Sequence, residues 1–155
     1  MQGIRKRFDK TLFEENDKKC RDKVREVLKN TDFTVQDNSK VRGVDLLLFN
    51  RTGQHIGYIE VERKTVWKGQ DFKYESVQFP ERKRKYTELD KPTIFVMFND
   101  DMTNFLVVKG TDLASSPCVE VPNKYMYKGE QFFQVPIDKV KFNDIVGVLK
   151  ETYGP

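Results

Sequence analysis

The chain has 155 residues, of which 37% are hydrophobic and 34% charged, which suits a single domain over residues 1–155 with one core. No stretch reaches the roughly 20 apolar residues of a membrane-spanning helix, and no apolar run follows the basic opening segment MQGIRKRFDK, so neither a membrane partner nor a secretory signal is expected. The net charge of +4 is mild, so the distribution of charge is more informative than its total.

Few side chains of the kinds that bind zinc are present. Cys20 and Cys118 lie far apart and form no CxxC pair, and His55 is the only histidine. A zinc cluster is therefore not expected, and any metal would be held by carboxylates, which favours Mg²⁺ or Mn²⁺. The sparse cysteines also favour a reducing, cytoplasmic (intracellular) compartment.

The first half of the chain predicts a helix followed by three strands. Residues 8–30 place apolar side chains on one helical stripe, and a short strand begins at residues 33–35. Residues 43–50 (GVDLLLFN) and 55–64 (HIGYIEVERK) are the clearest strands, and the glycine-containing segment between them predicts a tight hairpin turn.

The second half predicts a further helix, two strands and a closing helix. Residues 65–74 are irregular, and Pro80 precedes a short basic helix over residues 81–90. The remaining elements are strands at 93–99 and 104–109, a loop-rich stretch at 111–130, a short strand at 131–135 and a helix at 143–153. A strand, a helix and another strand in succession allow a crossover, so we expect an α/β fold with a mixed sheet.

The predicted hairpin gathers three carboxylates. If Thr52-Gly53 is a two-residue turn, paired residue numbers sum to 105 and Asp45 lies opposite Glu60. Glu62 and Lys64 then follow on the same face, because side chains alternate along a strand. Opposed carboxylates repel each other, and a divalent cation between them would remove the repulsion. The alternative is a solvated outer face, but Asp45 interrupts an apolar run, and a carboxylate in such a run needs a partner.

This constellation resembles the PD-(D/E)XK nuclease superfamily. The resemblance implies a restriction-endonuclease-like αβββαβ core, a mixed central sheet flanked by helices, and Mg²⁺ (or Mn²⁺) bound by Asp45 and Glu60. The opening portion resembles archaeal-type Holliday-junction resolvases: an acidic helix, a short strand, then G-V-D and I-E-V. No proline precedes Asp45, and Glu62 stands where the lysine of E-x-K is usual.

The resemblance further implies metal-dependent hydrolysis of nucleic-acid phosphodiesters by an endonuclease, for example at DNA junctions. Glu62 would be a metal ligand or a base, and Lys64 is the first choice for stabilising the developing negative charge. The functional lysine could instead come from the following helix, as Lys83 or Lys85. Asp17 in the first helix could reach the metal, although a position at the helix edge is the preferred interpretation.

Residues 63–86 hold eight basic and three acidic side chains, a net charge of +5. Such a local field attracts nucleic acid, and aromatic side chains among the basic ones could stack on unpaired bases. The predicted DNA contacts are Trp67, Lys68, Lys73, Arg82, Lys83 and Lys85. The alternative for Trp67 is that its ring simply anchors the loop to the core.

Two other functional classes are compatible with the sequence. One is a catalytically inactive DNA-binding or scaffold protein that keeps the nuclease fold, which Glu62 at the lysine position favours. The other is a small α/β domain that binds a protein partner through its acidic face. A homodimer is compatible with either class, since the sequence does not set the oligomeric state.

Overall fold

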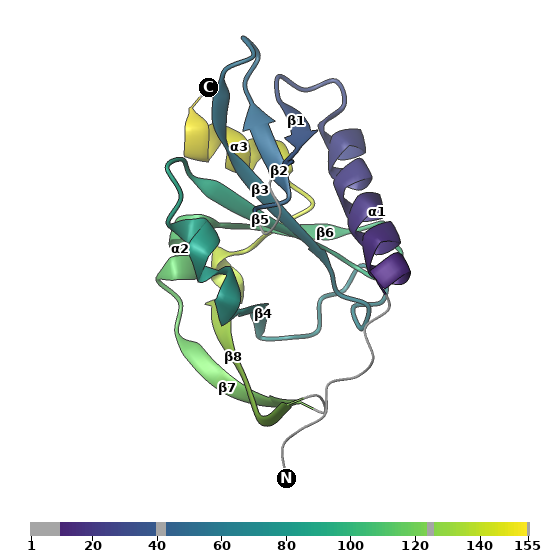
Figure 1. The fold of residues 1–155 in the computed structure, drawn as a ribbon, viewed down its shortest axis with the longest axis vertical. Helices are drawn as coiled ribbons and strands as arrows, with labels where there is room; N and C mark the ends of the chain where they lie inside the picture. Colours follow the sequence, from purple (N-terminus) through teal and green to yellow (C-terminus); the bar gives the residue numbers. More distant parts are fainter. Residues whose placement is uncertain (1–9, 40–42, 124–125, 155) are drawn as a thin grey trace.

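A six-stranded mixed sheet forms the centre of the protein in this computed structural model, which describes residues 10–39, 43–123 and 126–154 (Figure 1). The strand order is β1-β2-β3-β5-β6-β9. The central pair, β3 and β5, is parallel, and the other neighbours are antiparallel. The expected α/β class with a mixed sheet is therefore confirmed. The strands are β1 (Thr34–Asp37), β2 (Leu46–Phe49), β3 (His55–Arg63), β5 (Thr93–Phe98), β6 (Phe105–Lys109) and β9 (Lys141–Phe142).

Two helices cover one face of this sheet, α1 (Lys10–Leu28) and α3 (Ile145–Tyr153). The apolar stripe of α1 packs on β2 and β3 through Cys20, Val24 and Leu28. The predicted start of this helix at residue 8 lies outside the described residues. None of the described helices combines the length and apolar character needed to cross a membrane.

A smaller sheet covers the opposite face. It has the order β4-β8-β7, with β4 (Ser76–Pro80), β8 (Met126–Pro136) and β7 (Cys118–Asn123). Short helix α2 (Gly110–Ala114) packs beside it. A second apolar core lies between the two sheets and includes Phe79, Phe95 and Phe133. The segment from β3 to β5 therefore crosses this face as an irregular loop, then β4, then the 3₁₀ turn η1 (Glu81–Thr87).

Two predictions for this second layer were wrong. The stretch predicted to be loop-rich holds α2, β7 and the start of β8. The short strand expected at 131–135 is present as part of β8, which is much longer. Strand β4 was not predicted. The basic helix expected over residues 81–90 is η1, a shorter 3₁₀ turn. The small sheet depends on pairing between β4 and β8, which lie far apart in the chain, so local patterns carry little signal for it.

The hairpin between β2 and β3 has the predicted register, but its turn differs from the predicted one and a bulge follows it. The turn is not a two-residue Thr52-Gly53 turn: the Asn50 N–H donates to Gln54 O (2.9 Å), and Gly53 has a φ of +84°. A bulge beyond Leu48 then restores the pairing, so Leu48 pairs with Gly57. From Leu48 towards Asp45, the numbers of paired residues therefore sum to 105, as predicted.

Candidate metal and phosphate site

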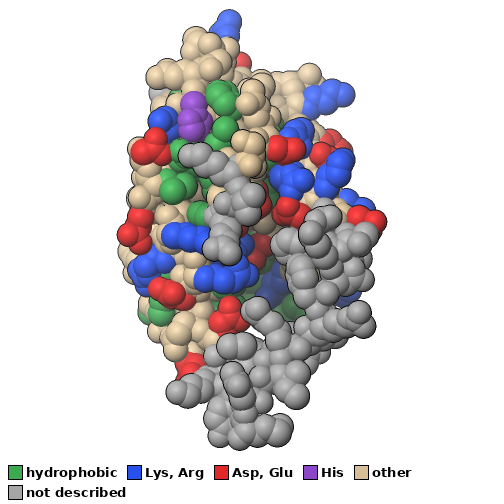
Figure 2. Space-filling view, viewed as in Figure 1, with side chains coloured by type: hydrophobic (Ala, Val, Ile, Leu, Met, Phe, Trp, Pro, Cys, Tyr) green, Lys and Arg blue, Asp and Glu red, His purple; other side chains and the backbone are tan. Residues whose placement is uncertain are grey.

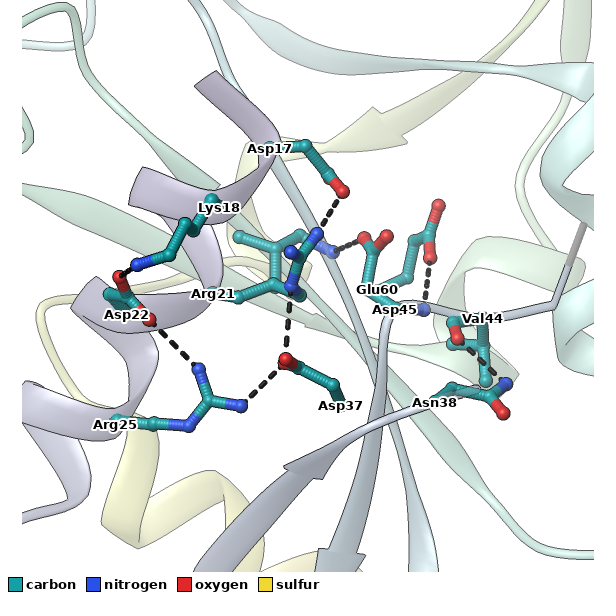
Figure 3. Close-up of polar contacts among 11 residues, drawn as sticks. Asp17, Lys18, Arg21, Asp22, Arg25, Asp37, Asn38, Val44, Asp45 and Glu60 are labelled. Carbon is teal, nitrogen blue, oxygen red and sulfur yellow. Dashed lines mark hydrogen bonds and ion pairs between the residues drawn. The ribbon is translucent and has the colours of Figure 1, made fainter. Parts of the chain in front are cut away.

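The hairpin places Asp45 and Glu60 against each other (Figure 3). Asp45 directly precedes β2, and its N–H donates to Glu60 Oε1 at 3.0 Å. In return, Asp45 Oδ2 accepts from the Val61 N–H at 2.9 Å. Burial, followed by the negative charge of Glu60, raises the pKa of Asp45 from 3.8 to about 7. The two carboxyl groups therefore lie side by side in a partly buried position, as the predicted register requires.

A buried lysine completes the cluster. Lys83 Nζ lies 3.3 Å from Glu60 Oε2 and 3.3 Å from Glu62 Oε2, and Lys83 is only 5% exposed. Burial alone lowers the pKa of this ammonium, but the charges of the surrounding carboxylates outweigh it and hold the pKa above its usual value. Lys83 is therefore a charged donor, positioned by η1 over the β3 carboxylates.

The carboxylates are not fully compensated by this lysine. Glu62 Oε1 is buried and has no hydrogen-bond partner among the described residues. An orphaned carboxylate oxygen beside the desolvated Asp45 fits a site for an added cation. The donors are all oxygens, which suit Mg²⁺ or Mn²⁺. Within the described residues, however, no three acidic, cysteine or histidine side chains already converge as a ligand set, and Lys83 is the cation that Glu60 and Glu62 share.

These side chains line a cavity of about 290 Å³, called the carboxylate cavity below. Helix α1 forms one wall, where Asp17 pairs with Arg21 (Figure 3). Burial, and then the charge of Asp45, raises the pKa of Asp17. Asp17 therefore lines the cavity, in contrast to the preferred helix-edge interpretation. The lining consists of Asn16, Asp17, Cys20, Asp45, Glu60, Val61, Glu62, Arg63, Thr65, Arg82 and Lys83.

Lys64, the first choice from the sequence, lies outside this lining. It follows the end of β3, and its Nζ lies 5.0 Å from the centroid of the Tyr74 ring. Lys83 lies at the carboxylates instead, which matches the alternative of a lysine supplied from the segment after the strands. The sequence signal for it was a lysine in that segment together with the missing lysine of E-x-K.

Two of the residues predicted to contact DNA are buried. Trp67 is 1% exposed and packs edge-to-face on Phe72 and Phe142, so its ring is not available to a base. That prediction is corrected to the anchoring alternative, because a large apolar ring gains more from the core than from solvent. Lys83 is likewise committed to the carboxylates. The other four predicted contacts, Lys68, Lys73, Arg82 and Lys85, are exposed.

Comparison with known proteins gives no family assignment: no family model, no curated protein and no solved structure matches the chain. The resemblance to the PD-(D/E)XK nucleases therefore stays a prediction from the sequence motif.

Proposed function

We propose that the protein is a metal-dependent nuclease that hydrolyses phosphodiester bonds of nucleic acid at the carboxylate cavity. The observation that carries the proposal is the pairing of the buried Lys83 ammonium with Glu60 and Glu62, with Asp45 hydrogen-bonded to Glu60 beside them. Carboxylates that hold a divalent ion beside a cationic donor are what hydrolysis of an anionic ester requires. Once β4, which belongs to the smaller sheet, is set aside, the order α1, β1, β2, β3, η1, β5 also agrees with a restriction-endonuclease-like core, with a 3₁₀ turn at the second helix.

Each side chain has a role in this proposal. Asp45, Glu60 and Glu62 would hold the Mg²⁺, which when bound polarises the phosphoryl group and lowers the pKa of water. The free oxygen Oε1 of Glu62 can accept a proton or orient the attacking water. Lys83 donates to the negative charge that develops on the phosphoryl oxygens. Lys83 takes over this role from Lys64 because its ammonium already lies at the carboxylates.

The charge around the cavity supports a polyanionic substrate. Arg82 lies on its rim with a side chain that is 69% exposed. Lys85 is exposed two residues further along η1. Cations placed beside an anionic pocket can hold the phosphates that flank the scissile one, and these contacts carry no sequence information. DNA is therefore the proposed partner.

Cleavage assays on a panel of branched and linear DNAs with Mg²⁺ or Mn²⁺ test the proposal. Asp45→Asn should abolish cleavage, and the exposed Asp101→Asn should not. Lys83→Met should lower the rate by roughly a hundredfold, a common order for losing one charge-stabilising donor, whereas Lys64→Met should leave it unchanged. Assays should run well below the melting temperature of each variant. Absence of cleavage by the wild-type protein with either ion would refute the nuclease proposal.

A non-catalytic DNA-binding protein is the second candidate, and one specific observation favours it. Lys83 already forms ion pairs with Glu60 and Glu62 without a metal, and no ligand set is preformed in the described part of the chain. Thermal melting with Mn²⁺ separates the two candidates. A metal-binding nuclease is stabilised by the ion, whereas a DNA-binding protein that holds no metal is not.

A further inference from the structure

We propose that a second cavity, beside the carboxylate cavity, receives one unpaired nucleobase of the bound nucleic acid. The inference rests on the proposed function and narrows its substrate to strands with unpaired nucleotides. The cavity has a volume of about 470 Å³, which is within the range of ligand-sized pockets. It is called the tyrosine cavity here, and its walls include Leu47, His55, Tyr58, Lys85, Tyr86 and Leu89.

The tyrosine cavity continues the face of the hairpin that carries the carboxylates. Leu47 pairs with Tyr58. Leu47 lies two residues after Asp45, and Tyr58 lies two residues before Glu60. Side chains two residues apart on a strand are separated by roughly 7 Å and point the same way. A nucleotide next to the phosphate in the carboxylate cavity therefore has its base within reach of the tyrosine cavity.

The turn η1 contributes side chains to both cavities. Lys83 reaches the carboxylates, while Lys85 and Tyr86 line the tyrosine cavity. The Tyr86 hydroxyl donates to the Gly43 carbonyl at 3.4 Å, two residues before Asp45 and close to the start of β2. One short element therefore sets the distance between the catalytic lysine and this pocket.

The walls suit the flat, partly polar face of a base. The His55 and Tyr58 rings meet edge-to-face, with centroids 4.9 Å apart. Hydrogen bonds fix both rings: Tyr58 Oη donates to Asp90 (2.6 Å), and His55 Nε2 lies 2.9 Å from the Gly57 carbonyl. Rings held in place lose little freedom when a base stacks on them.

A lysine in the cavity wall favours a nucleotide over an uncharged ligand. Lys85 is exposed, and its Nζ lies 5.1 Å from the centroid of the Tyr86 ring. Figure 2 shows hydrophobic side chains beside the histidine on this face, with basic side chains below them. The cavity offers apolar and aromatic walls for a base and a cation for its phosphate. A base within a duplex is stacked on both sides and cannot enter, so the pocket selects unpaired nucleotides.

The test measures how much the base itself adds to binding. Fluorescence anisotropy in EDTA at low salt gives the Kd of a short single-stranded oligothymidine and of the same oligonucleotide with abasic residues. The wild-type protein should bind the thymidine strand about tenfold tighter than the abasic strand. Leu89→Glu, which places a carboxylate at the mouth, should reduce this ratio to near one. Ile137→Glu is the matched control, because Ile137 is 37% exposed, Leu89 is 39% exposed, and Ile137 is not in the cavity wall.

The ratio of the two affinities does not depend on overall charge or on the folded fraction, because both strands meet the same protein. A ratio that falls in Leu89→Glu and persists in Ile137→Glu supports the inference. An equal ratio in both variants, or no preference in the wild type, overturns it and leaves the cavity to another kind of ligand. The nuclease proposal fails separately, on absence of metal-dependent cleavage.

Discussion

The buried lysine is the feature of the site that is most directly open to perturbation. In Lys83→Met the apolar stem is retained, and the ammonium that lies 3.3 Å from both Glu60 and Glu62 is lost. The variant leaves two carboxylates close together with Asp45 beside them and no positive charge between them. We expect it to be strongly destabilised without metal and to recover when a divalent ion is added.

The magnitude follows from the burial of the partners. Removing one member of a buried ion pair costs roughly 3–5 kcal/mol. Lys83 and Glu60 have side chains 6% and 10% exposed, but Glu62 is 24% exposed, which favours the lower end of that range. For a chain of 155 residues, about 3 kcal/mol corresponds to a fall of roughly 6–12 °C in melting temperature. An ion at about 100 times its Kd would restore about 2.7 kcal/mol.

Circular dichroism melting and urea denaturation at pH 7.5, in EDTA and in Mn²⁺, measure both effects. Lys85→Met is the matched control, because Lys85 lies two residues away and is exposed. Its effect should stay within about 0.5 kcal/mol, with no added dependence on the ion. Metal should stabilise Lys83→Met by more than it stabilises the wild type, since the ammonium no longer competes for Glu60 and Glu62.

Equal stability of Lys83→Met and Lys85→Met in EDTA would refute the reasoning, because it would mean that the carboxylates do not need this cation. If Lys83→Met is destabilised but Mn²⁺ does not restore its stability, the ion pair of Lys83 contributes to stability as expected, but these oxygens do not bind a metal.

Three further predictions concern Asp45, the exposed basic side chains of η1, and Trp67 in the irregular segment after β3. The pKa of Asp45 is about 7 in the folded protein and 3.8 in the unfolded chain. Between these pH values the folded protein binds one more proton than the unfolded chain, so the free energy of unfolding falls as the pH rises. Asp45→Asn should therefore be more stable than the wild type in EDTA at pH 8, by more than about 1 kcal/mol, and lose this advantage by about pH 4 in urea denaturation. Replacing Arg82 and Lys85 by alanine should weaken DNA binding and flatten the slope of log K against log salt by about 1–2. Trp67→Ala should cost about 3–5 kcal/mol of stability, measured by urea denaturation, because the ring is buried.

Matched controls separate these effects from general damage. For the salt slope, alanine at the exposed Lys139 and Lys141 removes the same charge elsewhere and should leave the slope unchanged. An equal change in both double variants would mean that the DNA surface is not at η1. For Trp67, the neighbouring Val66 is 62% exposed, and Val66→Ala should change stability by less than about 0.5 kcal/mol. A tolerated Trp67→Ala would show that the ring does not anchor the loop.

The strands and the pairing of Asp45 with Glu60 were predictable from local pattern. An apolar run directly after Asp45 marks β2, and alternation along β3 puts Glu60 and Glu62 on one face. The turn between them was wrong by one residue, and a bulge after Leu48 compensated for it. The register survived because a slip of one residue would have turned the buried leucines of β2 to the wrong face.

The choice of lysine was decided only by the tertiary structure. Lys64 continues the alternation of β3, but the strand ends at Arg63 and the ammonium of Lys64 reaches the Tyr74 ring instead. Lys83 reaches Glu60 and Glu62 because β4 pairs with β8 and η1 then carries the chain back over β3. That path depends on contacts between residues more than fifty positions apart, which no local period encodes. The grouping of the carboxylates could thus be predicted from local sequence pattern, whereas the cation that pairs with them depends on long-range packing.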